Sequence, residues 1–240
     1  MAAYAYASAG NQANSTSTST LSAAMPAGGG AASIAAGDVI FLLAKSQTES
    51  ATSTHSVPAG YSELGSIVRS DAGSPFARRY GAIQLWWKVA GVSEPSASVT
   101  LNSPGSGFDW YVQTYTYRAI GGSPLAKIVA GCVDDTTGST GAATYTPPSR
   151  TAPVGTVLAF IAQNRISGTL NEANAQGFTT RVTGTNEPAH KMMDKAVTAG
   201  SVTLPTLGIV GGTSRPWMSK SLVLDRDPGA GEWGVDRIAW

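Results

Sequence analysis

The chain carries the segment Ala36-Gly-Asp-Val-Ile-Phe-Leu-Leu-Ala44, an apolar run that follows a Gly-Asp turn signal. A second such run, Val154-Gly-Thr-Val-Leu-Ala-Phe-Ile-Ala162, lies in the second half of the chain. Both have the length of a buried strand and are followed by turn residues. The same pattern of short apolar runs between Gly, Pro, Ser and Asn continues throughout the chain, and no segment long enough to form a helix has helical periodicity. The sequence therefore predicts an all-β protein.

Outward from these two runs, we expect a strand wherever a short apolar or alternating segment lies between turn residues. The expected strands are residues 4–8, 15–21, 38–46, 61–70, 82–90, 98–101, 110–120, 125–130, 156–164, 178–183, 190–197, 201–204 and 217–224. Gly- and Ser-rich segments separate them, and Pro147-Pro148 marks a sheet edge or a crossing between sheets.

Landmarks recur in the same order in the two halves of the chain. Gly37 pairs with Gly155, Gly60 with Gly177, Lys88 with Lys195 and Trp110 with Trp217, at spacings of 118, 117, 107 and 107 residues. This predicts two related strand sets, residues 36–120 and 154–224, in which the two apolar runs occupy equivalent places. A duplicated set can fold as two facing sheets that share one core, as in a jelly roll. We expect one jelly-roll-type β-sandwich domain at residues 1–227, with extended N- and C-terminal arms.

Alternation along the strands indicates which faces are buried. One face of the 110–120 strand carries Tyr111, Gln113, Tyr115 and Tyr117, and its repeat counterparts are Met218, Lys220, Leu222 and Leu224. The shared apolar character predicts that this face points into the core. On the 82–90 strand the apolar alternation includes Trp87, so Trp86 is predicted to face outward. There it could stack on a sugar, cap a subunit contact or lie under a loop.

Composition narrows the classes of function. Charged residues make up 13% of the 240 residues, against about 25% in ordinary soluble domains, which favours a subunit packed in an assembly. A net charge of +1 predicts no binding to nucleic acid or to an anionic membrane. One cysteine, Cys132, and two histidines argue against a disulfide framework and a metal cluster. We therefore expect no metal and no cofactor.

Catalytic motifs are weak in this chain. Gly229-Ala-Gly-Glu-Trp-Gly234 matches G-x-G-x-x-G, but the helix and the acidic residue that such a loop needs are not expected after it. No G-x-S-x-G motif supplies a nucleophile for His55 or His190. A calcium site at Asp134-Asp135 lacks alternating oxygen ligands. No spacing selects two carboxylates for glycoside cleavage from Asp38, Glu63, Glu94, Asp109, Asp134, Asp135 and Asp194. We expect no catalytic residues.

A family resemblance rests on four motifs in a fixed order. They are Ala-Gly-Asp at 36–38, Pro-Ala-Gly-Tyr at 58–61, Trp-Lys-Val-Ala-Gly-Val-Ser-Glu-Pro at 87–95, and a strand that begins with Asp-Trp and ends with Tyr-Arg-Ala-Ile at 109–120. In this order they resemble the jelly-roll structural proteins of tailed bacteriophages, of the minor tail or decoration type. The resemblance covers residues 30 to 224. It implies a structural, receptor-facing or decorating role and supplies no catalytic residues.

We therefore expect a non-enzymatic structural component of a phage virion, either a tail- or baseplate-associated minor protein or a host-facing accessory protein. A capsid decoration or head-fibre-base protein and a carbohydrate-binding adhesion module are the alternatives, and a polysaccharide-cleaving enzyme ranks third. The expected partners are other virion proteins and further copies of the chain, with a host surface glycan in the adhesion alternative. Without a signal peptide or a long apolar segment, assembly is expected in the bacterial cytoplasm.

The last residues are expected to form a C-terminal docking arm, residues 228–240. Pro228-Gly229 makes a turn after the final strand, and Trp233, Ile238 and Trp240 follow. Each of these large side chains gains about 1.5–3 kcal/mol on full burial. We expect them to pack against another subunit and, with Trp86, to form the interface, while folding back onto their own chain is the alternative.

Overall fold

The computed structural model describes residues 4–26, 34–73, 79–120, 126–137, 141–164, 169–184, 189–210 and 215–226. Within these ranges all the regular secondary structure is β-strand, and the strands pair antiparallel. The predicted all-β class is thus confirmed.

The strands fall into two consecutive sets. The first strand set is β1 (Tyr4–Ala9), β2 (Ala13–Ser15), β3 (Thr20–Ala23), β4 (Val39–Thr48), β5 (Thr54–His55), β6 (Ser62–Asp71), β7 (Tyr80–Val89), β8 (Ala97–Asn102) and β9 (Phe108–Ala119). The second strand set is β10 (Ala126–Thr136), β11 (Thr144–Tyr145), β12 (Arg150–Ala152), β13 (Gly155–Gln163), β14 (Thr169–Asn174), β15 (Thr179–Gly184), β16 (His190–Val197), β17 (Gly200–Val202), β18 (Thr206–Val210) and β19 (Trp217–Arg226).

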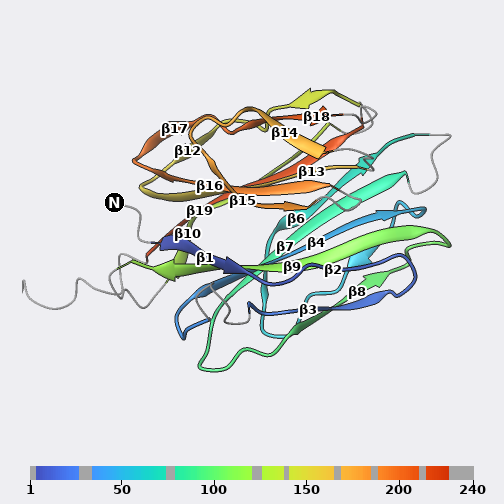
Figure 1. The fold of residues 1–240 in the computed structure, drawn as a ribbon, viewed down its shortest axis with the longest axis horizontal. Coiled ribbons are helices and arrows are strands. Elements are labelled where there is room, and N and C mark those ends of the chain that lie inside the picture. The colour runs from blue at the N-terminus through green and yellow to red at the C-terminus, as the bar shows by residue number, and fades with distance from the viewer. Residues whose placement is uncertain are drawn as a thin grey trace, which may run out of the picture.

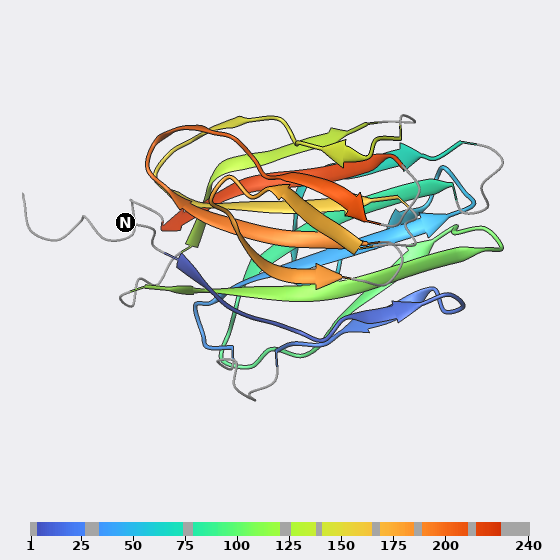
Figure 2. The ribbon, with the colours of Figure 1, turned by 45° about the horizontal axis from the view of Figure 1, so that its top comes forward.

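Four layers of strands are stacked in the molecule (Figures 1 and 2). The two inner sheets have the strand orders β1-β9-β4-β7-β6 and β10-β19-β13-β16-β15, and β2 also pairs with β9. The sheet β3-β8-β5 lies outside the first inner sheet, while β11-β18-β14 and β12-β17 lie outside the second. Each strand set therefore contributes one inner and one outer layer.

The two inner sheets have equivalent strand orders. The strands β1, β9, β4, β7 and β6 of the first sheet correspond, in that order, to β10, β19, β13, β16 and β15 of the second. Their registers agree as well. Phe41 on β4 pairs with Tyr115 on β9. Leu158, which lies 117 residues after Phe41, pairs with Leu222, which lies 107 residues after Tyr115. Thus β4 and β13 occupy equivalent places, as the repeat predicts.

This register corrects one predicted pairing of landmarks. At a spacing of 117 residues the counterpart of Gly155 is Asp38, so its pairing with Gly37 is wrong by one residue. Gly60 and Gly177 keep the predicted pairing. They adopt φ angles of +78° and +75°, which favour glycine, in turns of the same kind.

The central core lies between the two inner sheets. The rings of Phe41 and Phe160, one from each set, lie 6.3 Å apart across it. The predicted buried face is confirmed, because Tyr111, Tyr115, Tyr117, Leu222 and Leu224 are all in this core. One outer core in each strand set separates the inner sheet from its outer layer.

Because the inner sheets are buried on both faces, the prediction that Trp86 faces outward is wrong. Trp86 is fully buried in the outer core of the first set, where Val99 and Leu101 of β8 belong to the same cluster. Trp87 is partly buried against the central core. The alternation therefore separates the two faces correctly, but the outer layer covers the face that was expected to be exposed.

The two expected arms have different outcomes. At the N-terminal end, where an extended arm was expected, Tyr4 begins strand β1 and pairs with Ala119 at the edge of the inner sheet. Residues 228–240, the expected C-terminal docking arm, lie outside the described residues.

Candidate functional site

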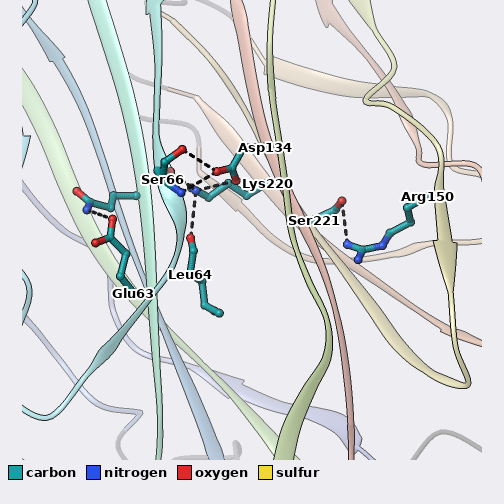
Figure 3. A network of polar contacts seen from close by, with 8 residues as sticks. Glu63, Leu64, Ser66, Asp134, Arg150, Lys220 and Ser221 are labelled. Atoms are coloured by element: carbon teal, nitrogen blue, oxygen red, sulfur yellow. Dashed lines mark hydrogen bonds and ion pairs between the residues drawn. The ribbon is translucent and has the colours of Figure 1, made fainter.

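The most concentrated polar chemistry lies where β6 of the first set meets β10 and β19 of the second (Figure 3). Lys220 on β19 is fully buried. Its Nζ donates hydrogen bonds to the backbone oxygens of Leu64 and Ser66 and to Oδ1 of Asp134, 2.8 Å away. An ammonium group has three donors, so all of them are satisfied. We call Lys220, Asp134 and the 64–66 backbone the lysine cluster.

A bulge in β6 forms the acceptor side of the lysine cluster. The pairing of β6 with β7 shifts register between Leu64 and Val68, and Gly65 within the bulge has a φ of +65°. The Asp134 carboxylate accepts hydrogen bonds from the backbone N–H of Ser66 at 2.8 Å and from its hydroxyl at 3.2 Å. A Cβ on Gly65 would come within 2.6 Å of this carboxylate. The glycine therefore permits both the bulge and the close approach of Asp134.

Ionisation at the lysine cluster follows from these contacts. Burial raises the pKa of Asp134, but the Lys220 ammonium and the Ser66 N–H outweigh it, so that the pKa lies below its usual value. Burial raises the pKa of the neighbouring Cys132 thiol to about 12. The thiol therefore stays protonated at neutral pH and is a poor nucleophile. Arg150 also lies nearby and donates to the Ser221 hydroxyl at 3.2 Å and the Gly131 oxygen at 3.0 Å.

A second polar cluster joins the two strand sets at the opposite edge of the inner sheets. Asp194 on β16 accepts a hydrogen bond from the Tyr117 hydroxyl at 2.7 Å and pairs with Arg181 on β15 at 2.9 Å. The Arg181 guanidinium lies 5.4 Å from the centre of the Tyr6 ring. Burial, and then the Asp194 charge, raise the pKa of Tyr117 well above its usual value. Tyr117 therefore remains a hydrogen-bond donor at physiological pH.

Between these clusters, Lys45 on β4 crosses into the second set. Its fully buried ammonium donates to the backbone oxygens of Gln163 and Ala189, both at 2.7 Å. His190 stacks on Tyr111 with ring centres 4.4 Å apart, and the Tyr115 hydroxyl lies 3.3 Å from its Nε2. The polar residues between the sheets therefore hold the two strand sets together.

The residues considered for catalysis are spread over the fold. His55 lies 3.0 Å from the Ser46 hydroxyl and stacks on Trp110, whereas His190 belongs to the second set. Several of the candidate carboxylates have cationic partners, since Asp38 pairs with Arg118 and Glu94 with Lys88. Among the described residues, no group of three His, Cys, Asp or Glu side chains could hold a metal ion.

The predicted interface residues are not brought together. Trp86 is buried inside the first set and has no exposed surface to offer a partner. Trp233, Ile238 and Trp240 lie outside the described residues, as does the G-x-G-x-x-G match at 229–234. Sequence reasoning missed the roles of Lys45 and Lys220, although a signal was present for Lys220. It alternates with Met218 and Leu222 on an apolar face, and a lysine there must find acceptors inside the core.

No helix in the described part of the chain is long and apolar enough to cross a membrane. Comparison with family models, with curated proteins and with solved structures found no match for the chain.

Proposed function

We propose that the chain is a non-enzymatic structural component of a bacteriophage virion, a tail- or baseplate-associated minor protein or a host-facing accessory protein. The observation that carries the proposal is the order in which the strands pair. In the first set β1 pairs with β9, β3 with β8 and β4 with β7, so that strands from the two ends of the set are nested like a long hairpin. Rolling such a hairpin into two layers produces a jelly roll, a fold that viral capsid domains use.

The second set supports the same assignment. Here β10 pairs with β19, β12 with β17 and β13 with β16. We therefore propose that the chain consists of two jelly-roll units packed against each other through their inner sheets. Together with the motif resemblance to phage structural proteins, this favours a role in an assembled particle.

The polar chemistry between the sheets also favours a structural role. The ammonium groups of Lys45 and Lys220 donate hydrogen bonds to backbone oxygens of the other strand set. A catalytic base or nucleophile needs a free lone pair or a lowered thiol pKa, and Cys132 has the opposite shift. The buried groups stabilise the contact between the two strand sets, which suits a component of an assembled particle.

A capsid decoration or head-fibre-base protein remains the second candidate, because its support is the same jelly-roll pairing. The carbohydrate-binding alternative loses the residue on which it depended. Trp86 was its one clear stacking surface, and this ring is buried in the outer core of the first set. We propose other virion proteins and further copies of the chain as partners, with assembly in the bacterial cytoplasm.

The C-terminal residues provide a test of incorporation. We propose that residues 228–240 dock on another subunit through Trp233, Ile238 and Trp240. A chain that ends at Asp227 should fold, as judged by an unchanged circular dichroism spectrum, but should be missing from purified virions whose genome encodes it. Mass spectrometry of those virions measures both chains. Absence of the full-length chain from the particles would contradict the virion role, whereas normal incorporation of the truncated chain would contradict only the docking arm.

A further inference from the structure

The two strand sets share the same local arrangement at the turns before β6 and β15, where an aromatic ring lies against a lysine. Tyr61 and Phe178 follow equivalent turns, in which their backbone N–H groups donate to the oxygens of Pro58 and Ala175. A lysine covers each ring: the ammonium of Lys88 lies 5.2 Å from the centre of the Tyr61 ring, and that of Lys195 lies 5.8 Å from the centre of the Phe178 ring. The two lysines occupy the same register place, because Lys88 pairs with Ile40 and Lys195 with Val157, its counterpart.

In the first set a glutamate completes this arrangement. After β7 the chain makes the loop Gly91-Val-Ser-Glu-Pro-Ser96, and Glu94 folds back toward the strand. The Glu94 carboxylate forms an ion pair with Lys88 and accepts a hydrogen bond from the Gly91 N–H. The Glu94 side chain is only 5% exposed. The lysine in the first set is thus neutralised by a carboxylate from its own loop.

In the second set this loop is shorter by four residues. Ala90 and Ala97 correspond to Val197 and Gly200, and only Thr198 and Ala199 lie between the latter two. Among the described residues, the contacts of the Lys195 ammonium are the Gln176 oxygen, at 2.7 Å, and the Phe178 ring. The second set has the lysine but lacks a segment like the one that carries the carboxylate in the first set.

A pocket of about 370 Å³ is found at this place. Its walls include Gln176, Lys195, Thr198, Gly200, Ser201 and Thr203. Lys195 therefore supplies a cation, with one donor on the Gln176 oxygen and two remaining. Three residues of the wall, Thr198, Ser201 and Thr203, carry hydroxyl groups. None of the described residues in this wall is acidic.

We propose that this pocket binds a carboxylate from an acidic peptide segment of a partner protein, which takes the place that Glu94 occupies in the first set. The first set shows the expected geometry: a glutamate whose carboxylate contacts the lysine and a backbone N–H in a short loop. A charge-assisted hydrogen bond between ammonium and carboxylate is stronger than one between neutral groups, and the hydroxyl groups can accept or donate to the peptide backbone. This binding site stands independently of the virion role.

The probe follows from the first set. The capped peptide Gly-Val-Ser-Glu-Pro reproduces residues 91–95, and the matched control carries Gln in place of Glu. Titrating each into the ¹⁵N-labelled full-length protein and following amide shifts should show saturable changes at Thr198, Gly200, Ser201 and Thr203 with the Glu peptide. The Gln peptide should bind about tenfold more weakly or worse, because it lacks the charge. Lys195→Met, which keeps the aliphatic stem over Phe178, should weaken the Glu peptide by a similar factor.

A loop graft provides a second test that does not depend on removing the lysine. Replacing Thr198-Ala199 with Gly-Val-Ser-Glu-Pro-Ser should place a glutamate of the same chain in the pocket and abolish peptide binding. The control graft carries Gln in place of this Glu, and it should leave the lysine free to bind an added carboxylate. Titration with glucuronate, a sugar that carries a carboxylate, tests whether the pocket prefers an acidic sugar to an acidic peptide. The proposal is overturned if the Glu and Gln peptides shift the pocket amides equally, if neither shifts them, or if glucuronate saturates the pocket while the Glu peptide does not.

Discussion

Replacing Lys220 with Met tests whether the lysine cluster holds the two strand sets together. Met fills much of the volume of the lysine stem but removes the ammonium. Asp134, whose side chain is 21% exposed, then loses its counter-ion, and the oxygens of Leu64 and Ser66 lose a donor. Removing one partner of a buried ion pair costs about 3–5 kcal/mol. Because water can reach part of Asp134, we expect a cost just below this range, about 2–3 kcal/mol.

Urea denaturation followed by tryptophan fluorescence measures this loss. For a chain of this length, each kcal/mol corresponds to about 2–4 °C in Tm, so a loss of about 4–12 °C is expected in calorimetry. Lys195→Met is the matched control, since Lys195 is a partly buried residue whose ammonium donates to a single backbone oxygen. This change should cost less than about 1 kcal/mol.

The pH dependence of the difference identifies its cause. The pKa of Asp134 is lowered in the folded protein. The stability that this carboxylate contributes is therefore fully present above its unfolded pKa, about 3.9, and is lost as the pH falls through the lower folded value. The difference between the wild type and Lys220→Met should be full at pH 7 and shrink below about pH 4. A cost below about 1 kcal/mol at pH 7 would refute the role of Lys220 as a tie between the sets. A cost that does not change with pH would show that the Asp134 ion pair is not its cause.

Three further changes test other parts of the account. Gly65→Ala should cost about 1–3 kcal/mol, because Gly65 has a φ of +65° and its Cβ would meet Asp134; a neutral result in urea denaturation would show that the bulge adapts. Burial lowers the pKa of His55 from 6.5 to about 4, so stability should be full above pH 6.5 and fall by up to about 3 kcal/mol as the pH drops toward 4; an unchanged pH profile in His55→Phe would contradict this. Trp86→Ala should cost about 3–5 kcal/mol if Trp86 is a core residue, whereas an exposed Trp86 would tolerate the change in thermal denaturation.

Much of the inner fold could be predicted from the sequence because its strands are long and apolar. The strand 190–197 was predicted with its observed bounds, and those at 38–46 and 156–164 differ from β4 and β13 by at most two residues. The expected strand at 15–21 is instead broken into β2 and β3. Its Ser15 hydroxyl accepts hydrogen bonds from the N–H groups of Ser17 and Thr18 and so stabilises a turn.

The outer layers were largely missed. Strands β5, β11 and β12 have two or three residues each, too few for alternation to be recognised. Strand β8 overlaps the expected strand 98–101, but nothing in the sequence showed that it lies over the second face of the inner sheet. This is why Trp86 was placed on the surface.

The contacts between the strand sets were also beyond sequence reasoning. Lys220 and Asp134 lie 86 residues apart, and their pairing depends on how the inner sheets face each other. The pocket beside Lys195 depends on the different lengths of the loops that follow Lys88 and Lys195, and the predicted repeat aligned the two lysines without these loops.

The central claim, that the chain is a structural component of a virion built from two equivalent strand sets, is tested most directly by a cryo-electron microscopy map of the particle whose genome encodes it. The account predicts density for a four-layer body attached to the tail or the capsid, with β4 and β13 at the middle of its two inner sheets and Leu158 superposing on Phe41. A map in which every protein is assigned and this chain is missing would contradict the virion role, and density that shows the second set with a different strand order would contradict the equivalence of the two sets.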